Sequence, residues 1–164
     1  MPMSSAFQQR LFPHLAAIAD HFGTPFHIYD ERGIRETGAE LRAAFSGVRG
    51  FQEYFAVKAL PNPHILSIIH DMGFGFDCSS VPELILSRQV GARGESIMFT
   101  SNNTSPAEFQ MALADGGSIL NLYDVSLLGK MQGSVSTMPE ILSFRYNPGA
   151  RRTGNAIIGN PVEA

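Results

Sequence analysis

Short apolar runs alternate along this chain with longer stretches in which hydrophobic residues recur at helical intervals. From Phe51 onward, each apolar run ends in polar residues, and a turn and an amphipathic helical pattern follow it. The strands predicted in this way are 54–57, 74–76, 96–99, 119–122 and 141–144. Their polar ends lie at Lys58, Ser80, Asn102, Asp124 and Asn147, which is a repeat of roughly 22 residues. The pattern therefore predicts five successive βα units.

Helix-start and helix-end signals support these boundaries. The segments 80–83 (Ser-Val-Pro-Glu) and 105–108 (Ser-Pro-Ala-Glu) each predict a capping box with proline in the first turn. Asn62-Pro63 predicts a similar helix start. Glycines 73, 91, 116 and 117 stand where the helices are expected to end.

The first 50 residues follow a different pattern. Apolar residues at helical spacing predict an amphipathic helix over 7–22, which Gly23 ends. Residues 26–29 predict a short strand, and Asp30 is a candidate N-cap for a second helix. The expected order of this part is therefore helix, strand, helix.

Nearly all-apolar strands that alternate with helices predict a parallel sheet covered on both faces. A leucine-rich solenoid has a similar period, but its Leu/Asn consensus is missing here. An open doubly wound sheet and a barrel remain, and polar residues at the carboxyl end of every strand favour a (β/α)8 barrel. Those residues are Lys58, Asp77, Ser80, Thr100, Asn102, Tyr123, Asp124, Arg145 and Asn147. Because such a barrel has eight strands in about 250 residues, we expect a partial barrel that looks truncated.

The composition is that of a folded domain with little charge. The 164 residues are 44% apolar and only 16% charged, against about 25% in an average soluble domain. We therefore expect a good part of the chain's surface to be covered by a partner or by further chain. Twelve basic against fifteen acidic residues give a net charge of −3, which argues against nucleic acid as a partner.

The single cysteine, Cys78, cannot form an internal disulfide, and no Cys/His group has metal-ligand spacing. We expect Cys78 to be a small buried side chain rather than a reactive thiol. The sequence has neither a signal peptide nor an apolar run long enough for a membrane span. These features predict a cytoplasmic protein without a metal or a membrane partner.

Lys58 follows the apolar residues Phe55-Ala56-Val57 at the mouth of a predicted strand. A lysine at such a position can lose its proton through desolvation and then attack a carbonyl carbon. Alternatively, its side chain simply extends from the sheet into solvent, and position alone favours this second interpretation.

The residues around Lys58 add a resemblance. The segment 54–63, Tyr-Phe-Ala-Val-Lys-Ala-Leu-Pro-Asn-Pro, resembles the cofactor-lysine motif of pyridoxal-phosphate-dependent amino-acid decarboxylases with an alanine-racemase-like barrel. Four further stretches, 24–30, 75–84, 99–103 and 144–149, follow in that family's order. Asn147-Pro148-Gly149 is most similar to diaminopimelate decarboxylase, whereas 75–79 also resembles the ornithine and arginine branch.

The resemblance implies a pyridoxal 5′-phosphate (PLP) enzyme that decarboxylates an amino acid, with Lys58 as the Schiff-base lysine. Meso-2,6-diaminopimelate, which would yield L-lysine, is the expected substrate, and a homodimer is the expected full-length assembly. The alternatives are an ornithine, arginine or carboxynorspermidine decarboxylase, a barrel racemase or small cofactor-carrying protein, and a non-catalytic homologue that binds a partner as antizyme inhibitors do.

The resemblance also implies roles for individual residues. Asp77 and Arg145 match positions close to the cofactor, where an arginine donates to the ring's phenolic oxygen or pairs with the aspartate. Both residues also have a plainer interpretation without a ligand. For Asp77 it is that an aspartate at a strand end is often only a turn former. The weaker candidates are Ala56, Ser80, Glu83, Asn102, Tyr123 and Asn147. A capping box would explain Ser80 and Glu83 without any ligand.

Several family features do not match this chain. Residues 101–104 read Ser-Asn-Asn-Thr where many members carry Gly-Asn-x-Lys. The family's glycine-rich phosphate loop, its acidic partner of the pyridine nitrogen and its C-terminal β domain are expected after residue 164. We thus expect residues 1–30 to supply a helix and a strand that joins that β domain, and 31–164 to form the incomplete barrel. The 164 residues alone are expected to be inactive.

Overall fold

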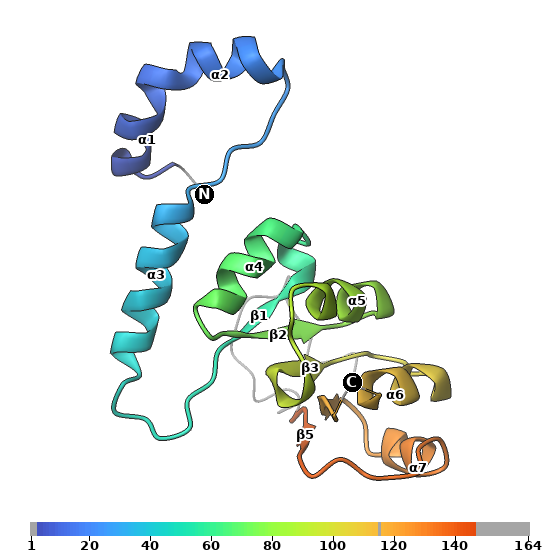
Figure 1. Cartoon of the computed structure of the whole chain (residues 1–164). Helices are drawn as coiled ribbons and strands as arrows, with labels where there is room; N and C mark the ends of the chain where they lie inside the picture. The colour runs from blue at the N-terminus through green and yellow to red at the C-terminus, as the bar shows by residue number, and fades with distance from the viewer. Residues whose placement is uncertain (1–2, 115, 147–164) are drawn as a thin grey trace, which may run out of the picture. The chain divides into compact units, whose positions relative to one another are not determined.

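The computed structural model describes residues 3–114 and 116–146 (Figure 1). It divides into two compact units, Met1–Phe51 and Gln52–Ala164. The sequence instead predicted a boundary after residue 30, because residues 1–30 were expected to join a β domain that follows residue 164. That boundary stays a prediction.

The first unit consists of helical segments. They are α1 (Ser5–Leu11), the 3₁₀ turn η1 (Phe12–His14), α2 (Leu15–Phe22) and α3 (Glu31–Ala44). The single helix predicted over 7–22 is wrong, because Pro13 has no N–H for the next helical hydrogen bond and a 3₁₀ turn interrupts the helix there. Gly23, with φ +75°, ends α2 as expected.

Residues 26–29, which were expected to form a strand, have no strand partner in the described chain and connect α2 to α3. The Asp30 side chain does not cap α3; its Oδ2 accepts a hydrogen bond from Arg10 Nη2 at 2.5 Å. This ion pair ties the start of α3 to α1.

The second unit contains five parallel strands with helices between them. The strands are β1 (Tyr54–Ala56), β2 (Gly75–Cys78), β3 (Ile97–Phe99), β4 (Ile119–Leu122) and β5 (Leu142–Phe144). The helices and 3₁₀ turns are η2 (Val57–Ala59), α4 (Pro63–Asp71), α5 (Val81–Gln89), η3 (Gly94–Ser96), α6 (Pro106–Leu113) and α7 (Ser126–Gln132). All five predicted strands are confirmed, with shifts of one or two residues at their ends.

The strands pair in the order β1-β2-β3-β4-β5, so each crossover leads to the next strand (Figure 1). A doubly wound sheet reverses its strand order at a switch point, whereas a (β/α)8 barrel does not. Among the described residues there is no reversal. The second unit is therefore part of a (β/α)8 barrel, as the polar strand ends predicted.

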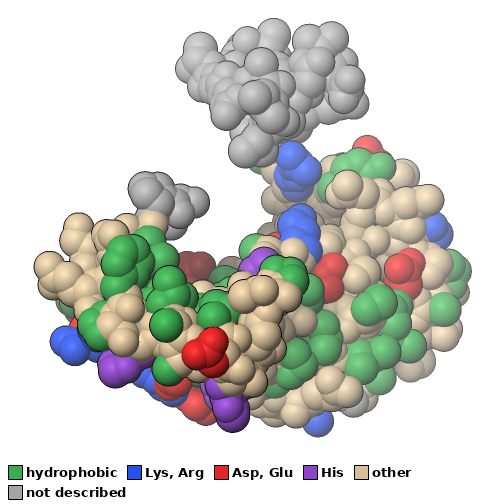
Figure 2. Space-filling view, turned by 90° about the horizontal axis from the view of Figure 1, so that it is seen from above, with side chains coloured by type: hydrophobic (Ala, Val, Ile, Leu, Met, Phe, Trp, Pro, Cys, Tyr) green, Lys and Arg blue, Asp and Glu red, His purple; other side chains and the backbone are tan. Residues whose placement is uncertain are grey.

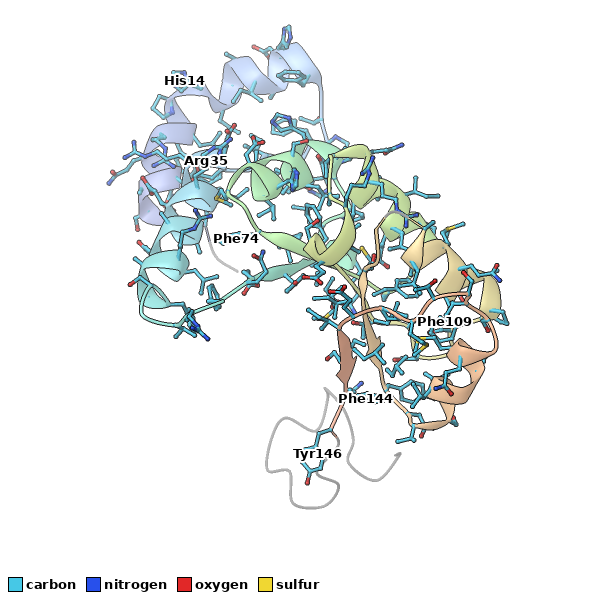
Figure 3. The ribbon with its side chains drawn as sticks, turned by 60° about the horizontal axis from the view of Figure 1, so that its bottom comes forward. His14, Arg35, Phe74, Phe109, Phe144 and Tyr146 are labelled. Atoms are coloured by element: carbon cyan, nitrogen blue, oxygen red, sulfur yellow. The ribbon has the colours of Figure 1, made fainter. Side chains whose placement is uncertain are left out.

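The two faces of the sheet differ strongly in burial. On the face toward the helices, the side chains of Phe76, Cys78, Ile97, Phe99, Leu120 and Leu122 are at most 2% exposed. Figure 3 shows Phe109 of α6 packed among the side chains next to the sheet, whereas Tyr146 stands clear of the others. This layer between helices and sheet is the core of the second unit.

The opposite face carries Ala56, Asp77, Met98, Thr100, Asn121 and Ser143, all of them half-buried. The register pairs Ala56 with Asp77, Asp77 with Met98 and Asn121 with Ser143, so these side chains share one side of the sheet. We call this side the open face. The sequence predicted a sheet covered on both faces without saying by what; in a barrel, helices cover one face and the second face lines the interior.

Candidate functional site

Three predicted site residues lie at the carboxyl end of the sheet. Lys58 is in η2, directly after β1; Asp77 is in β2; and Arg145 follows β5. Because all five strands are parallel, their carboxyl ends form one edge, and the fold brings the three residues to it. Lys58 and Arg145 are exposed, and within the described residues neither side chain has a hydrogen bond or an ion pair.

Only two lysines occur in the sequence. Lys130 is in the last turn of α7, on the helical layer, whereas Lys58 is at the carboxyl end of the sheet. If an amine of this chain reacts with a ligand at that end, it is the amine of Lys58.

Asp77 is held by a side-chain hydrogen bond from the neighbouring strand. The Thr100 hydroxyl donates to Asp77 Oδ1 at 2.7 Å, and Asn121 Nδ2 donates to Thr100 Oγ1 at 3.3 Å. The ion pair between Asp77 and Arg145, one of two roles expected for the arginine, is absent from the described part of the chain. Thr100 holds one oxygen of this carboxylate instead.

Glu83 has a structural role in the turn between β2 and α5. Its carboxylate accepts hydrogen bonds from Ser79 N at 3.0 Å, Ser79 Oγ at 2.9 Å and Ser80 Oγ at 2.8 Å, and the residue is only 9% exposed. The predicted capping box is wrong in form, because Ser80 Oγ donates to the carboxylate instead of accepting from the backbone. These bonds account for Ser80 and Glu83 without a ligand, and any role in binding stays a prediction.

The remaining candidates are spread along the same edge. Ala56 ends β1 and is half-buried, Asn102 is exposed in the loop after β3, and Tyr123, directly after β4, is 46% exposed. Asn147 lies outside the described residues. Their roles toward a ligand stay predictions.

Sequence reasoning missed Asn121 and noted Thr100 only as a polar strand end. The one local signal for Asn121 was a polar residue inside the apolar strand Ile-Leu-Asn-Leu. Its significance depends on the neighbouring strand, because Thr100 is brought opposite to it only by the β3–β4 pairing.

Cys78 is confirmed as a buried side chain. Its Sγ lies 3.2 Å from Ser87 Oγ, and burial raises the pKa of the thiol to about 12. A thiol with this pKa is almost entirely protonated near neutral pH, so Cys78 is not a nucleophile.

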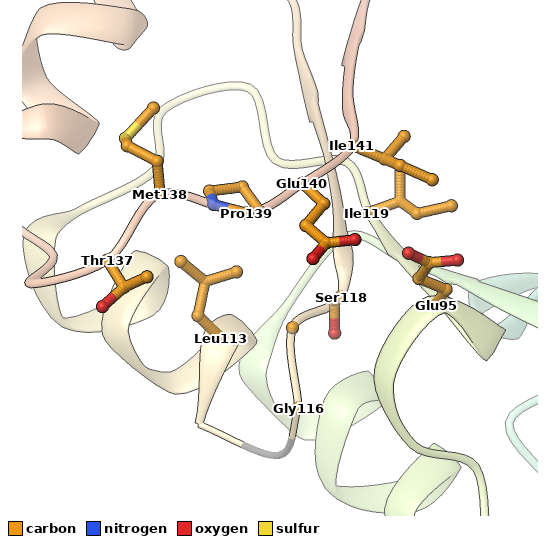
Figure 4. A pocket seen from close by; sticks show the side chains of 11 residues that line it. Glu95, Leu113, Gly116, Ser118, Ile119, Thr137, Met138, Pro139, Glu140 and Ile141 are labelled. Carbon is orange, nitrogen blue, oxygen red and sulfur yellow. The ribbon is translucent and has the colours of Figure 1, made fainter.

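A cavity of about 390 Å³ lies at the other end of the sheet, before β4 and β5 (Figure 4). Glu95, Ser118 and Glu140 are among the residues that line it. In (β/α)8 barrels the amino ends of the strands contribute to stability and the carboxyl ends carry the active site. The cavity is therefore separate from the candidate site.

The space-filling view shows charged side chains among larger areas of hydrophobic and uncharged ones (Figure 2). Over the described residues, no group of three or more His, Cys, Asp or Glu residues could hold a metal ion. The same residues include no helix that is long and apolar enough to cross a membrane.

The side chains at the carboxyl end fit a pyridoxal-type cofactor. A primary amine without a protein partner can bond to an aldehyde, and a guanidinium can donate to a phenolic or phosphate oxygen. One oxygen of the Asp77 carboxylate, Oδ2, has no hydrogen-bond partner among the described residues and is available to a ligand. The donor set is thus an amine after β1, a carboxylate in the neighbouring β2 and a guanidinium after β5, all at the carboxyl end of the sheet.

Comparison with known proteins agrees with this chemistry. The family described as "Pyridoxal-dependent decarboxylase, pyridoxal binding domain" matches residues 32–160. The chain is 46% identical over its whole length to Protein TabA of Pseudomonas amygdali pv. tabaci, of which it covers 38%. It is 36% identical over 150 residues to diaminopimelate decarboxylase of Methanothermobacter thermautotrophicus, a match of 88% of this chain and 34% of the relative.

Among solved structures, diaminopimelate decarboxylase from Helicobacter pylori complexed with L-lysine is similar with a TM-score of 0.76. The two chains are 27% identical, and the match covers 82% of this chain and 34% of the other. The chain spans about a third of the length of the relatives it matches. It belongs to the family of pyridoxal-dependent decarboxylases, and its second unit is part of their PLP-binding barrel.

Proposed function

We propose that the full-length protein is a PLP-dependent amino-acid decarboxylase in which Lys58 holds the cofactor. The observation that carries this proposal is the Lys58 amine at the carboxyl end of β1, which has no partner among the described residues, on the edge that also bears Asp77 and Arg145. When bound, PLP supplies the electron sink that allows carbon dioxide to leave an amino acid.

The residues of this chain have separate tasks in the proposed reaction. The Lys58 Nζ would hold the cofactor through its aldehyde carbon and would carry a proton at the reacting carbon. The Arg145 guanidinium donates to an anionic oxygen of the ring or its phosphate. Asp77 offers its Oδ2 to the ligand while Thr100 holds Oδ1.

We further propose meso-2,6-diaminopimelate as the substrate and L-lysine as the product. The support is the Asn147-Pro148-Gly149 motif, several diaminopimelate decarboxylases among the relatives, and a similar structure that was solved with L-lysine. The resemblance also supports a cytoplasmic location and a homodimer. Analytical ultracentrifugation of the full-length protein tests the homodimer.

A second substrate class is favoured by one departure from the family pattern. Residues 101–104 lack the lysine that many members carry. A relative from Niallia circulans, 29% identical over 140 residues, is an L-glutamyl-[BtrI acyl-carrier protein] decarboxylase, so the family's substrates extend beyond diaminopimelate. Ornithine, arginine and carrier-bound substrates therefore belong in the assay beside diaminopimelate.

The test is Lys58→Ala in the full-length protein, with Lys130→Ala as the matched control. We expect Lys58→Ala to lose the visible absorbance of the lysine-bound cofactor and to lower decarboxylation on the order of a thousandfold or more. Lys130→Ala is expected to retain both, because Lys130 is exposed on α7.

Each other result has a definite meaning. Full absorbance and activity in Lys58→Ala refute the proposal. Decarboxylation of another amino acid but not of diaminopimelate refutes the proposed substrate alone. A wild-type protein that binds an amino acid without releasing carbon dioxide is instead a non-catalytic binding protein.

A further inference from the structure

Three polar side chains form a hydrogen-bonded row across the open face, from β4 through β3 to β2. Asn121 Nδ2 lies 3.3 Å from Thr100 Oγ1, which lies 2.7 Å from Asp77 Oδ1. We infer that Thr100 and Asn121 are positioning residues, which orient the Asp77 carboxylate toward PLP. This inference rests on the proposed function.

The row has one direction. A threonine hydroxyl has a single proton, and an ionised carboxylate can only accept, so Thr100 donates to Asp77. The amide N–H of Asn121 then occupies an acceptor position of the same hydroxyl. Asn121 thus keeps the Thr100 proton directed at Asp77.

The backbone supports this geometry. Thr100 N–H donates to Cys78 O at 2.8 Å, which extends the β2–β3 ladder by one step beyond Phe99. The β3–β4 register pairs Phe99 with Leu120, so Thr100 and Asn121 stand opposite each other one step further along. Neighbouring strands therefore hold both side chains at a fixed spacing from Asp77.

The row leaves half of the carboxylate for a ligand. Hydrogen bonds to charged groups are short and roughly twice as strong as neutral ones, and the 2.7 Å contact is of this kind. Oδ1 is held by this contact, whereas Oδ2 has no partner within the described chain. The three side chains are half-buried on the face that lines the barrel interior. The fixed Asp77 carboxylate is therefore directed at a ligand inside the barrel.

The experiment measures the affinity for PLP of the cofactor-free full-length protein by absorbance titration, beside the kcat and KM of decarboxylation. Thr100→Val keeps the shape of the side chain but removes the hydroxyl, and we expect it to weaken PLP binding about tenfold. Thr100→Ser, which keeps the hydroxyl, is expected to stay within about threefold of wild type. Asn121→Leu, which removes the longer bond, is expected to lose about threefold.

A double-mutant cycle separates positioning from a merely structural role. Asp77→Ala should itself weaken PLP binding, and Thr100→Val should then add nothing to it, because Thr100 acts through Asp77. Ser143→Ala is the matched control, since Ser143 is half-buried on the same face and has no side-chain hydrogen bond in the described residues. The melting temperature of each cofactor-free variant is measured in parallel.

The outcomes are distinct. Unchanged PLP affinity in Thr100→Val, an equal loss in Thr100→Ser, additive losses with Asp77→Ala, or losses that follow the melting temperature each overturn the inference while the proposed function stands. A wild-type protein that binds no PLP overturns both.

Discussion

Replacement of Gly75 by alanine tests how closely β1, β2 and β3 approach one another. A Cβ at Gly75 would lie 2.6 Å from the carbonyl oxygen of Ser96 and 2.7 Å from Cδ1 of Tyr54. Ser96 O belongs to the backbone just before β3, and the Tyr54 hydroxyl donates to Glu95 O at 2.8 Å. Neither neighbour can withdraw without moving a strand or breaking this hydrogen bond.

The magnitude follows from two opposing effects. Overpacking of a tight interior costs about 1–3 kcal/mol, and two rigid contacts under 3.0 Å favour the upper end, about 3 kcal/mol. The reduced entropy of the unfolded chain returns about 0.4–1 kcal/mol. We therefore expect Gly75→Ala to lower the free energy of unfolding by about 2 kcal/mol, or the melting temperature by about 4–8 °C.

The assay is urea and thermal unfolding of the full-length protein followed by circular dichroism. Gly129→Ala is the matched control, because Gly129 lies inside α7 and a Cβ there meets nothing within 4 Å. The same chemical change should raise stability at this position by about 0.5–1 kcal/mol. If the free energy of unfolding of Gly75→Ala is within about 0.5 kcal/mol of wild type while Gly129→Ala is stabilising, the strands do not approach as closely as the structure indicates.

The remaining predictions concern Cys78 and the capping box at the start of α6. Burial raises the pKa of Cys78 from 9.0 to about 12, so iodoacetamide should label this thiol only after unfolding, and rapid labelling of the native protein would contradict its burial. Since the folded chain keeps a proton that the unfolded chain loses, stability should fall as the pH rises above 9.0, and less steeply in Cys78→Ala. At α6, Ser105 Oγ accepts from Glu108 N at 3.3 Å and Glu108 Oε2 accepts from Ser105 N at 2.7 Å, so Ser105→Ala should cost about 1 kcal/mol in urea unfolding. The Ser105 N–H lowers the pKa of Glu108, so any stability lost in Glu108→Gln should shrink as the pH falls through that pKa; a pH-independent difference would exclude this contribution.

Local signals were sufficient where the chain contacts itself within a few residues. Asn62 Oδ1 accepts from the N–H groups of His64 and Ile65 at the start of α4, as the Asn-Pro pair predicted. The Ser105–Glu108 capping box is confirmed, and the glycines expected to end helices have positive φ angles. The same kind of signal was not sufficient at Ser80, because Glu83 has several serine donors within reach and the sequence does not say which bond forms.

In the second unit, the sequence by itself determined the order of strands and helices and the position of Lys58 after the first strand, because hydrophobic periodicity and caps act over a single turn or strand. Only the tertiary structure decided which side of the sheet the helices cover and which side chains meet on the other side. The contact between Asp77 and Thr100 joins residues 23 positions apart, and the contact between Thr100 and Asn121 joins residues 21 positions apart. Such contacts depend on the register of neighbouring strands. Packing across the whole sheet selects this register, and no local sequence pattern contains it.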